Sequence, residues 1–201
     1  MLIVALTGNY GMGKTTVLEM FRDLGAATLK TDEIVGALLK DASVLKTIRR
    51  EFGDEVFSGG GDLNREKLSH IVFRDRDKRD GLEKILHPLV FEKIEEFLKE
   101  RVAKATNKDV VIIEIPLLFE KNYTKRFSRN IVVYTDEETA LKRLQESGIT
   151  RDNAMMRLNA QMPIKEKVKR ADFVIDNSGS LEHTRAQVRE TYHKLRENRQ
   201  E

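Results

Sequence analysis

The chain has 201 residues, and its 36 lysines and arginines against 33 aspartates and glutamates give a formal net charge of +3. Its hydrophobic content of 40% is ordinary for a folded protein, and no apolar run approaches the roughly 20 residues of a membrane-spanning helix. The lack of cysteine excludes disulfides, cysteine–zinc sites and thiol nucleophiles. Because the first residues lack a basic stretch and a cleavage site, we expect a cytoplasmic protein with no membrane partner.

Short, β-branched apolar runs alternate with longer helical patterns along the chain. The expected strands are Leu2–Thr7, Ala26–Lys30, Asp109–Glu114, Asn130–Thr135 and Phe173–Asp176. Four of them are apolar at consecutive positions, which is typical of strands buried on both faces of a parallel sheet. The pattern predicts a three-layer α/β fold with a five-stranded parallel sheet.

The clearest helical pattern covers Leu82–Val102, where apolar residues recur every three or four positions. It contains His87-Pro88, which on structural grounds alone is a kink or a helix start. A mixed-charge helix is expected from Ser180 onward. The length predicts a single domain, residues 1–201, in which the helical stretches 31–107 and 141–171 exceed a normal crossover connection.

A glycine-rich motif follows directly on the first expected strand. Residues 8–15 read Gly-Asn-Tyr-Gly-Met-Gly-Lys-Thr and satisfy G-x-x-x-x-G-K-[ST] in full. The glycines allow positive φ, and the backbone N–H groups at the start of the next helix favour phosphate; the alternative is a chance glycine loop. We expect Mg-ATP as the ligand, with Lys14 between the β- and γ-phosphates and the Thr15 hydroxyl on Mg²⁺. The expected contacts of ATP in this loop are Gly8, Gly11, Met12, Gly13, Lys14, Thr15 and Thr16.

Two acidic residues stand at expected strand ends, where ligands bind in open parallel sheets. Asp32 follows the second strand by two residues, and Glu114 closes the third. A carboxylate at this edge can orient or deprotonate an attacking hydroxyl, or hold a metal through water. The alternative for Asp32 is the N-cap of a helix over Glu33–Leu39, and for Glu114 it is a strand-terminal charge.

The net positive charge is concentrated in the segment from Arg143 to Arg170, which contains seven basic and three acidic residues. A compact cationic segment suits a phosphate-rich small ligand at least as well as a duplex, and no nucleic-acid module is recognisable. We therefore expect no nucleic-acid partner. The alternative interpretation of this segment is a solvated pair of helices.

The glycine-rich motif of residues 8–15 is a phosphate-binding loop (P-loop). Together with Asp32, the cationic segment and several separated motifs, it makes the chain resemble the dephospho-CoA kinase family of P-loop kinases. Residues 61–65 resemble its Asp-Gly-x-Leu-x-Arg stretch, residues 86–88 match its Leu-His-Pro, and residues 116–120 match its Pro-Leu-Leu-Phe-Glu. Residues 157–163 and 170–179 are close to its C-terminal pattern. One departure is Lys30-Thr31-Asp32, where the family often has Asp-Ala-Asp.

The resemblance implies a P-loop kinase fold with an acceptor-binding helical insertion over about residues 31–107 and a helical lid over residues 148–169. It implies transfer of the ATP γ-phosphoryl group to the ribose 3′-hydroxyl of dephospho-CoA, giving CoA and ADP. The implied catalytic residues are Asp32, Lys14 and Arg143. Arg143 is a further implied contact of ATP at the phosphates, Asn177 and Gly179 are implied contacts of ATP at the adenine, and Glu114 is expected near Mg²⁺ through water. The acceptor site is expected to comprise Asp32, Arg65, His87, Pro116, Leu117, Leu118, Phe119 and Glu120; ordinary core is the alternative for its apolar members.

The residues alone leave other functions open. A kinase for another hydroxyl acceptor, such as a nucleoside monophosphate, shikimate or gluconate, would share Lys14, Thr15 and Arg143. A nucleotide-dependent switch is a second alternative, although Asn107-Lys108-Asp109 does not have the spacing of the base-reading motif N-K-x-D. A basic nucleic-acid-binding protein is a third. We expect a monomer or a weak homo-oligomer.

Overall fold

A computed structural model describes residues 1–104 and 110–197 and divides the chain into two compact units. The helical unit is residues 31–104, and the sheet unit is the described chain before and after it, residues 1–30 and 110–197. The helical unit begins at the residue where the insertion was expected to begin. The expected end of the insertion, at residue 107, lies outside the described residues.

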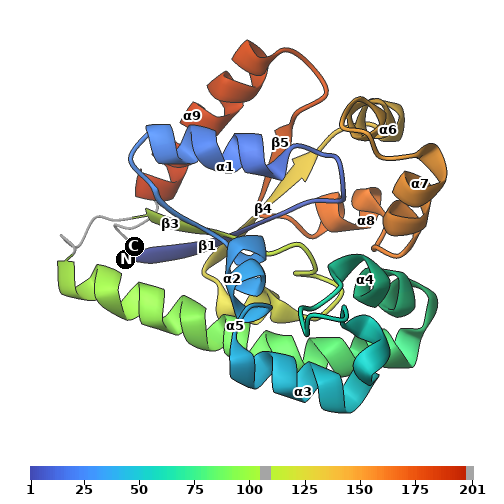
Figure 1. Ribbon diagram of the computed structural model, residues 1–201. Helices are drawn as coiled ribbons and strands as arrows, with labels where there is room; N and C mark the ends of the chain where they lie inside the picture. Colours follow the sequence, from blue (N-terminus) through green and yellow to red (C-terminus); the bar gives the residue numbers. More distant parts are fainter. Residues whose placement is uncertain (105–109, 198–201) are drawn as a thin grey trace. The chain divides into compact units, whose positions relative to one another are not determined.

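The sheet unit is built on five parallel strands in the order β2-β3-β1-β4-β5 (Figure 1). All five expected strands are present, which confirms the α/β fold class. Their bounds differ from the expected ones by at most one residue, apart from Asp109, which lies outside the described range. The strands are β1 (Leu2–Thr7), β2 (Ala27–Lys30), β3 (Val110–Glu114), β4 (Arg129–Tyr134) and β5 (Phe173–Asp176).

The main core joins one face of the sheet to α1 (Lys14–Asp23) and α9 (Leu181–Glu197), which lie together in Figure 1. Residues between these core positions, such as Ala5 and Ile113, are fully buried as well. Burial on both faces explains why the strands are continuously apolar. The buried members of this core include Val4, Leu6, Val17, Phe21, Ile112, Ile131, Ile175 and Val188.

Three helices connect β4 to β5: α6 (Glu137–Glu146), α7 (Arg151–Asn159) and α8 (Ile164–Lys169). Asp136 and Thr150 cap α6 and α7 by accepting hydrogen bonds from backbone N–H groups. A second core cluster joins α6 to α7 through Leu141, Leu144, Ala154 and Leu158. A short 3₁₀ helix, η2 (Tyr123–Arg126), precedes β4.

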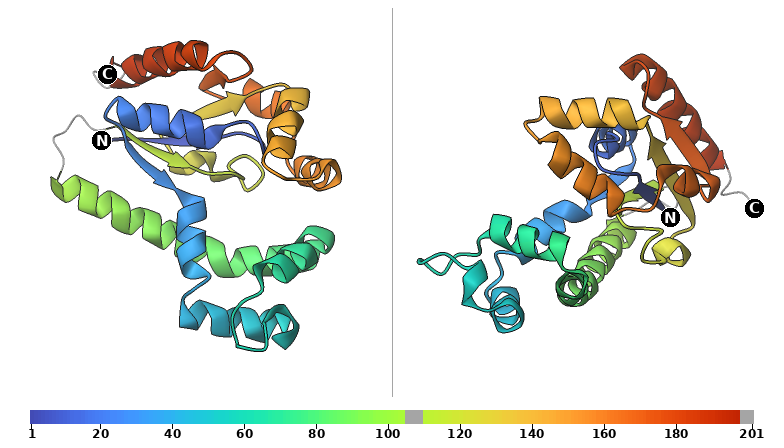
Figure 2. Two further views of the ribbon diagram at one scale, coloured as in Figure 1. Left: turned by 45° about the horizontal axis from the view of Figure 1, so that its top comes forward. Right: turned by 90° about the vertical axis from the view of Figure 1, so that its right-hand side faces the viewer.

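The helical unit contains α2 (Thr31–Leu38), α3 (Ala42–Phe52), the 3₁₀ helix η1 (Asp54–Val56), α4 (Arg65–Arg74) and α5 (Arg76–Lys104). Helices α2, α3 and α4 each contact α5 (Figure 2, blue to light green). The apolar faces of these helices are buried through Val44, Ile48, Phe52, Leu68, Leu86, Val90 and Ile94.

Pro88 lies inside α5, which begins at Arg76, so the helix-start interpretation of His87-Pro88 is wrong. A proline in a helix interior costs about 3 kcal/mol. Leu86 and Val90 are buried on either side of it, and each buried side chain of this size contributes about 1.5–3 kcal/mol. Burial of the apolar stripe thus outweighs the lost backbone hydrogen bond. Across the described parts of the chain, no helix is both long and apolar enough to span a membrane.

Candidate active site

The loop between β1 and α1 has the backbone of a phosphate cradle. Gly11 and Gly13 have φ of 79° and 81°, in the left-handed region. A Cβ on Gly8 would approach the Val133 carbonyl oxygen to 2.5 Å, and one on Gly11 would approach the Ala140 carbonyl oxygen to 2.9 Å. Gly13 is the N-cap of α1, and no side chain caps this helix. Its N-terminal N–H groups therefore offer an anion site that fits the phosphates of a nucleotide.

Arg143 of α6 reaches the same end of α1. Its Nη2 donates to the Asn177 carbonyl oxygen at 2.9 Å. Its Nη1 is buried and makes no hydrogen bond within the described parts of the chain, and a Cβ on Gly13 would lie 3.7 Å from it. A buried donor without an acceptor is costly, and a phosphate oxygen at this helix end would satisfy it. The geometry supports the expected contact of Arg143 with ATP.

Asn177, expected beside the adenine, has a side chain enclosed by the protein, with the residue only 3% exposed. Its Nδ2 donates to the Met12 carbonyl oxygen at 3.0 Å, and its Oδ1 accepts from Thr184 Oγ1 at 3.0 Å. The amide is thus committed to holding the P-loop, while Met12 is itself buried. The adenine contact stays a prediction for the backbone of this segment and for the exposed Gly179.

Lys14 folds back over the loop, and its Nζ donates to the Asn9 carbonyl oxygen at 3.2 Å. Thr15 and Thr16 are exposed in the first turn of α1. The buried Glu114 ends β3, in register with Leu6 of β1 and with Lys30 of β2.

The oxygen atoms of Thr15 and Glu114 are the donor type that Mg²⁺ prefers. Within residues 1–104 and 110–197, no three His, Cys, Asp or Glu side chains form a preassembled metal site.

The 116–120 loop follows β3 and has two different parts. Leu118 and Phe119 are buried, as the ordinary-core interpretation expects, whereas Pro116 and Leu117 are half-buried. The Pro116 carbonyl oxygen accepts a hydrogen bond from Thr7 Oγ1 at 3.3 Å, which ties the loop to the end of β1. Pro116 and Leu117 are therefore the apolar residues of this loop that keep surface for a ligand.

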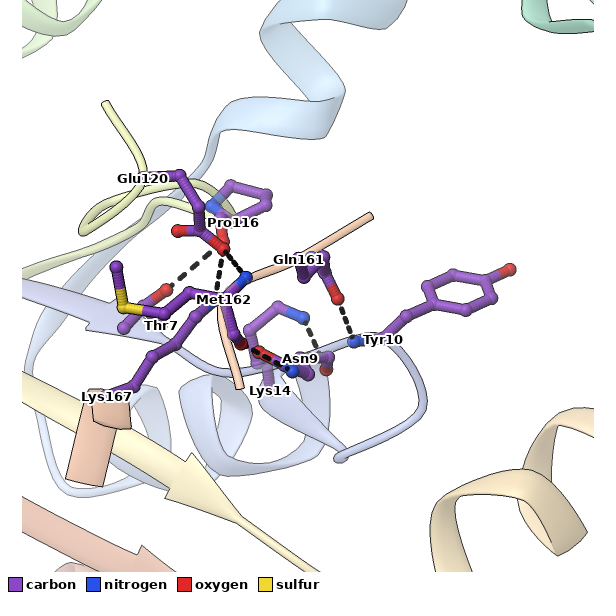
Figure 3. A network of polar contacts seen from close by, with 9 residues as sticks. All are labelled: Thr7, Asn9, Tyr10, Lys14, Pro116, Glu120, Gln161, Met162 and Lys167. Carbon is purple, nitrogen blue, oxygen red and sulfur yellow. Dashed lines mark hydrogen bonds and ion pairs between the residues drawn. The ribbon is translucent and has the colours of Figure 1, made fainter. Parts of the chain in front are cut away.

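Glu120, expected at the acceptor site, takes part in a largely buried polar network (Figure 3). Its Oε1 accepts from the Met162 backbone N–H at 3.0 Å and lies 2.8 Å from Lys167 Nζ. The Lys167 side chain is 0% exposed and that of Glu120 is 15% exposed. Burial lowers the pKa of the Lys167 ammonium group, and the Glu120 carboxylate opposes that shift. Sequence reasoning counted Lys167 only as one of several lid cations.

Residues between α7 and α8 lie across the P-loop (Figure 3). The Gln161 Oε1 accepts from the Tyr10 backbone N–H at 2.8 Å, and the Met162 carbonyl oxygen accepts from Asn9 Nδ2 at 3.0 Å. Arg157 Nη1 donates to the Tyr10 hydroxyl at 2.6 Å, with its guanidinium carbon 4.8 Å from the ring centroid. The C-terminal part of the expected lid is thus attached to the P-loop. Sequence reasoning missed Asn9 and Tyr10 because both occupy variable positions of the motif.

In the helical unit, Asp32 is exposed in the first turn of α2. The helix begins at Thr31, directly after β2, so Asp32 is not its N-cap and that alternative is wrong. Arg65 Nη2 donates to the Gly36 carbonyl oxygen at 2.9 Å. Gly36 lies one turn beyond Asp32 and therefore on the same side of α2. The structure thus brings Arg65 to the helix that carries Asp32, while His87 is half-buried in α5.

Comparison with known proteins agrees with this geometry. The sequence model of the Dephospho-CoA kinase family matches residues 2–183. The dephospho-CoA kinase of Aquifex aeolicus is 39% identical over 194 residues, which covers 96% of each chain. The crystal structure of a protein from Thermus thermophilus has a TM-score of 0.83 to this structure at 33% sequence identity. The match covers 96% of this chain and 97% of the Thermus chain.

A second solved structure, dephospho-CoA kinase from Campylobacter jejuni, has a TM-score of 0.68 at 27% identity and covers 98% of both chains. The family match includes the motifs outside the P-loop, at residues 61–65, 86–88 and 116–120. The glycine backbone, the uncapped helix and the buried arginine nitrogen are all features that a P-loop kinase uses to hold phosphate. The chain belongs to the dephospho-CoA kinase family.

Proposed function

We propose that the chain transfers the γ-phosphoryl group of ATP to the ribose 3′-hydroxyl of dephospho-CoA and so forms coenzyme A and ADP. The observation that carries this proposal is the family match over residues 2–183, which reaches far beyond the nucleotide-binding loop. Relatives at about 40% identity over almost the whole chain, such as those of Aquifex aeolicus and Carboxydothermus hydrogenoformans, are dephospho-CoA kinases.

On the nucleotide side, the phosphates lie on the N-terminal N–H groups of α1, with Lys14 between the β- and γ-phosphates. Arg143 donates its buried Nη1 to a phosphate oxygen. Both cations stabilise the charge that develops as the phosphoryl group moves from one oxygen to another. Arg143 keeps its orientation because its second nitrogen is already bound to the Asn177 carbonyl oxygen.

On the acceptor side, Asp32 orients the ribose 3′-hydroxyl and accepts its proton. Its exposed carboxylate in the first turn of α2 is available to a substrate hydroxyl. Arg65 and His87 contact the acceptor beside it, and Pro116 and Leu117 provide apolar surface for the pantetheine arm. Thr15, together with Glu114 through water, would hold Mg²⁺, and the ion would supply positive charge that neutralises the phosphates.

Residues 31–107 act as the acceptor-binding part and residues 148–169 as the lid. Closure of the lid excludes water, which would otherwise accept the phosphoryl group. The attachments of Arg157, Gln161, Met162 and Lys167 restrict lid motion to the part that precedes residue 157. The protein works in the cytoplasm as a monomer or weak homo-oligomer. Size-exclusion chromatography with light scattering measures its oligomeric state.

The experiment that tests the proposal offers Mg-ATP with one acceptor at a time: dephospho-CoA, AMP, shikimate or gluconate. ADP formation is followed with a coupled assay. Rapid ADP release with dephospho-CoA alone is the expected result. Release with one of the other acceptors instead would assign the chain another substrate. Slow release that does not depend on any acceptor would favour a nucleotide-dependent switch.

A further inference from the structure

Three hydrogen bonds in sequence connect Glu120 with the lysine of the P-loop (Figure 3). Glu120 Oε1 accepts from the Met162 N–H at 3.0 Å. The Met162 carbonyl oxygen accepts from Asn9 Nδ2 at 3.0 Å, and the Asn9 carbonyl oxygen accepts from Lys14 Nζ at 3.2 Å. The chain of contacts therefore runs from the loop after β3, through the α7–α8 connection, to the ammonium group of Lys14.

The far end of this chain is fixed by a buried ion pair. Lys167 Nζ lies 2.8 Å from the same Oε1 of Glu120 that accepts from Met162, and the lysine side chain is fully buried. An unpaired buried ammonium group is strongly unfavourable, so the lysine holds the carboxylate at this position. The second oxygen of Glu120, Oε2, is buried and accepts no hydrogen bond from any residue in the described ranges. A single carboxylate oxygen thus serves both Met162 and Lys167.

We propose that Glu120 is a positioning residue for the nucleotide-binding side of the site. It fixes the backbone of residues 161–162 over the P-loop, and through Asn9 it fixes the position of the Lys14 ammonium group. Lys167 balances the charge of the buried Glu120 carboxylate. The enclosed carboxylate therefore acts on ATP binding through other residues. The inference rests on the phosphate-binding role proposed above for Lys14.

The ion pair and the hydrogen bond to Met162 are separable by mutation. In a Lys167→Met background, Glu120→Gln removes both charges and keeps an oxygen that can accept from Met162. In the same background, Glu120→Leu removes the charges and the acceptor together. Replacing a buried ion pair by apolar residues of similar volume is often neutral or stabilising, so the Leu double variant is expected to fold. The Gln double variant keeps a hydrogen-bond partner for its amide oxygen and is expected to fold as well. The two variants differ in the side-chain amide of residue 120, which carries the acceptor.

The measurement is the dissociation constant of Mg-ATP by titration calorimetry, at a temperature where circular dichroism shows each variant folded. Lys167→Met/Glu120→Gln is expected to bind Mg-ATP like the wild type. Lys167→Met/Glu120→Leu is expected to bind it a few-fold to about thirtyfold more weakly, the range typical of mutations in a coupled network. Adding Asn9→Ala should weaken binding in the Gln background and have no further effect in the Leu background, because the link is already broken there.

Glu166→Gln is the matched control, since Glu166 forms an exposed pair with Lys169 on the same helix at 2.8 Å. This variant should bind Mg-ATP like the wild type. Equal Mg-ATP affinities of the Gln and Leu double variants would overturn the proposal, and so would additive effects of Asn9→Ala in both backgrounds. Failure of the phosphate-binding role of Lys14 itself has a different signature, because Lys14→Ala would then bind Mg-ATP like the wild type.

Discussion

Arg143 and Asn177 are joined by one hydrogen bond, from the arginine Nη2 to the asparagine carbonyl oxygen at 2.9 Å. Arg143 lies on the helix that follows β4, and Asn177 follows β5, while the P-loop follows the neighbouring β1. The Asn177 side chain completes the connection by donating to the Met12 carbonyl oxygen at 3.0 Å. The segments after three adjacent strands are thus bound together around the N-terminus of α1. Arg143 keeps its buried Nη1 beside Gly13 for a phosphate oxygen.

Arg143→Ala is expected to lower turnover more than it lowers ATP affinity. An arginine that stabilises the transition-state charge of phosphoryl transfer contributes about 10³–10⁵ in rate. Steady-state kinetics with varied ATP and saturating dephospho-CoA separates kcat from KM. A loss that appears in the Michaelis constant alone would assign Arg143 to ground-state binding.

Lys14→Ala is expected to abolish transfer, with a loss of at least about 10²–10³ in kcat, because the phosphates lose the ammonium group that stabilises their developing charge. ADP formation in the presence of dephospho-CoA measures this. Lys142→Ala, which removes an exposed lysine from α6, is the control and should remain active. Comparable activities of the two variants would contradict the assigned role of Lys14.

Asp32→Asn is expected to reduce kcat by about 10²–10⁴, the usual contribution of a general base. Glu33→Gln removes the neighbouring exposed acid of the same helical turn and should leave kcat within a few-fold of the wild type. Near-normal turnover of Asp32→Asn would remove this residue from the catalytic machinery. The rate is measured over a pH series, so that a shifted optimum is not mistaken for a lost base.

Gly13→Ala is expected to prevent Mg-ATP binding and to destabilise the protein. The added Cβ would collide with Asn177 Nδ2. Residue 13 also has a φ of 81°, which residues other than glycine rarely adopt. Gly60→Ala is the matched control, because no atom lies within 4 Å of a Cβ built there. Calorimetry and urea unfolding measure both effects, and a Gly13→Ala protein that binds Mg-ATP normally would contradict the cradle geometry.

Glu120→Gln is expected to make stability more dependent on pH. Burial lowers the pKa of Lys167 below its usual 10.5, and Glu120 opposes that shift, so its removal lowers the pKa further. A lysine with a lower pKa in the folded state binds fewer protons there than in the unfolded state. The free energy of unfolding therefore rises with pH across the window between the two pKa values, by at most about 1.4 kcal/mol per pH unit.

Urea unfolding from pH 7 to pH 10 checks this expectation. Glu120→Gln should be less stable than the wild type at pH 7 and should recover part of the difference as the pH rises. Glu166→Gln removes the exposed partner of Lys169 and should follow the wild-type curve. A Glu120→Gln curve that runs parallel to the wild-type curve would mean that Lys167 does not stay charged and buried in the variant.

Local sequence predicted most of the sheet and the phosphate cradle, because both depend on short-range patterns. A short, continuous run of β-branched apolar residues such as Val110–Ile113 predicts a strand that is buried on both faces. The P-loop spacing likewise sets the turn, the helix start and the lysine within eight residues. Where packing competes with a local rule, as at Pro88 in α5, the local rule gave the wrong helix start.

The remaining features depend on contacts between distant segments, which no local pattern encodes. In the sequence, Lys167 does not differ from the other basic residues of the expected lid, and only the fold places it beside Glu120. Asn177 looks like a nucleotide contact, but its amide is used by Met12 and Thr184. Tyr10 occupies a variable motif position, and its contact with Arg157 follows from the packing of α6 and α7.

Phosphorus NMR of the reaction of Mg-ATP with dephospho-CoA tests the central claim most directly, because it identifies both the group transferred and the oxygen that receives it. We expect one new phosphomonoester signal, coupled to the ribose 3′ proton, that grows at the same rate as ADP. ADP accompanied by free inorganic phosphate, or a phosphate on any other hydroxyl, would contradict the assignment.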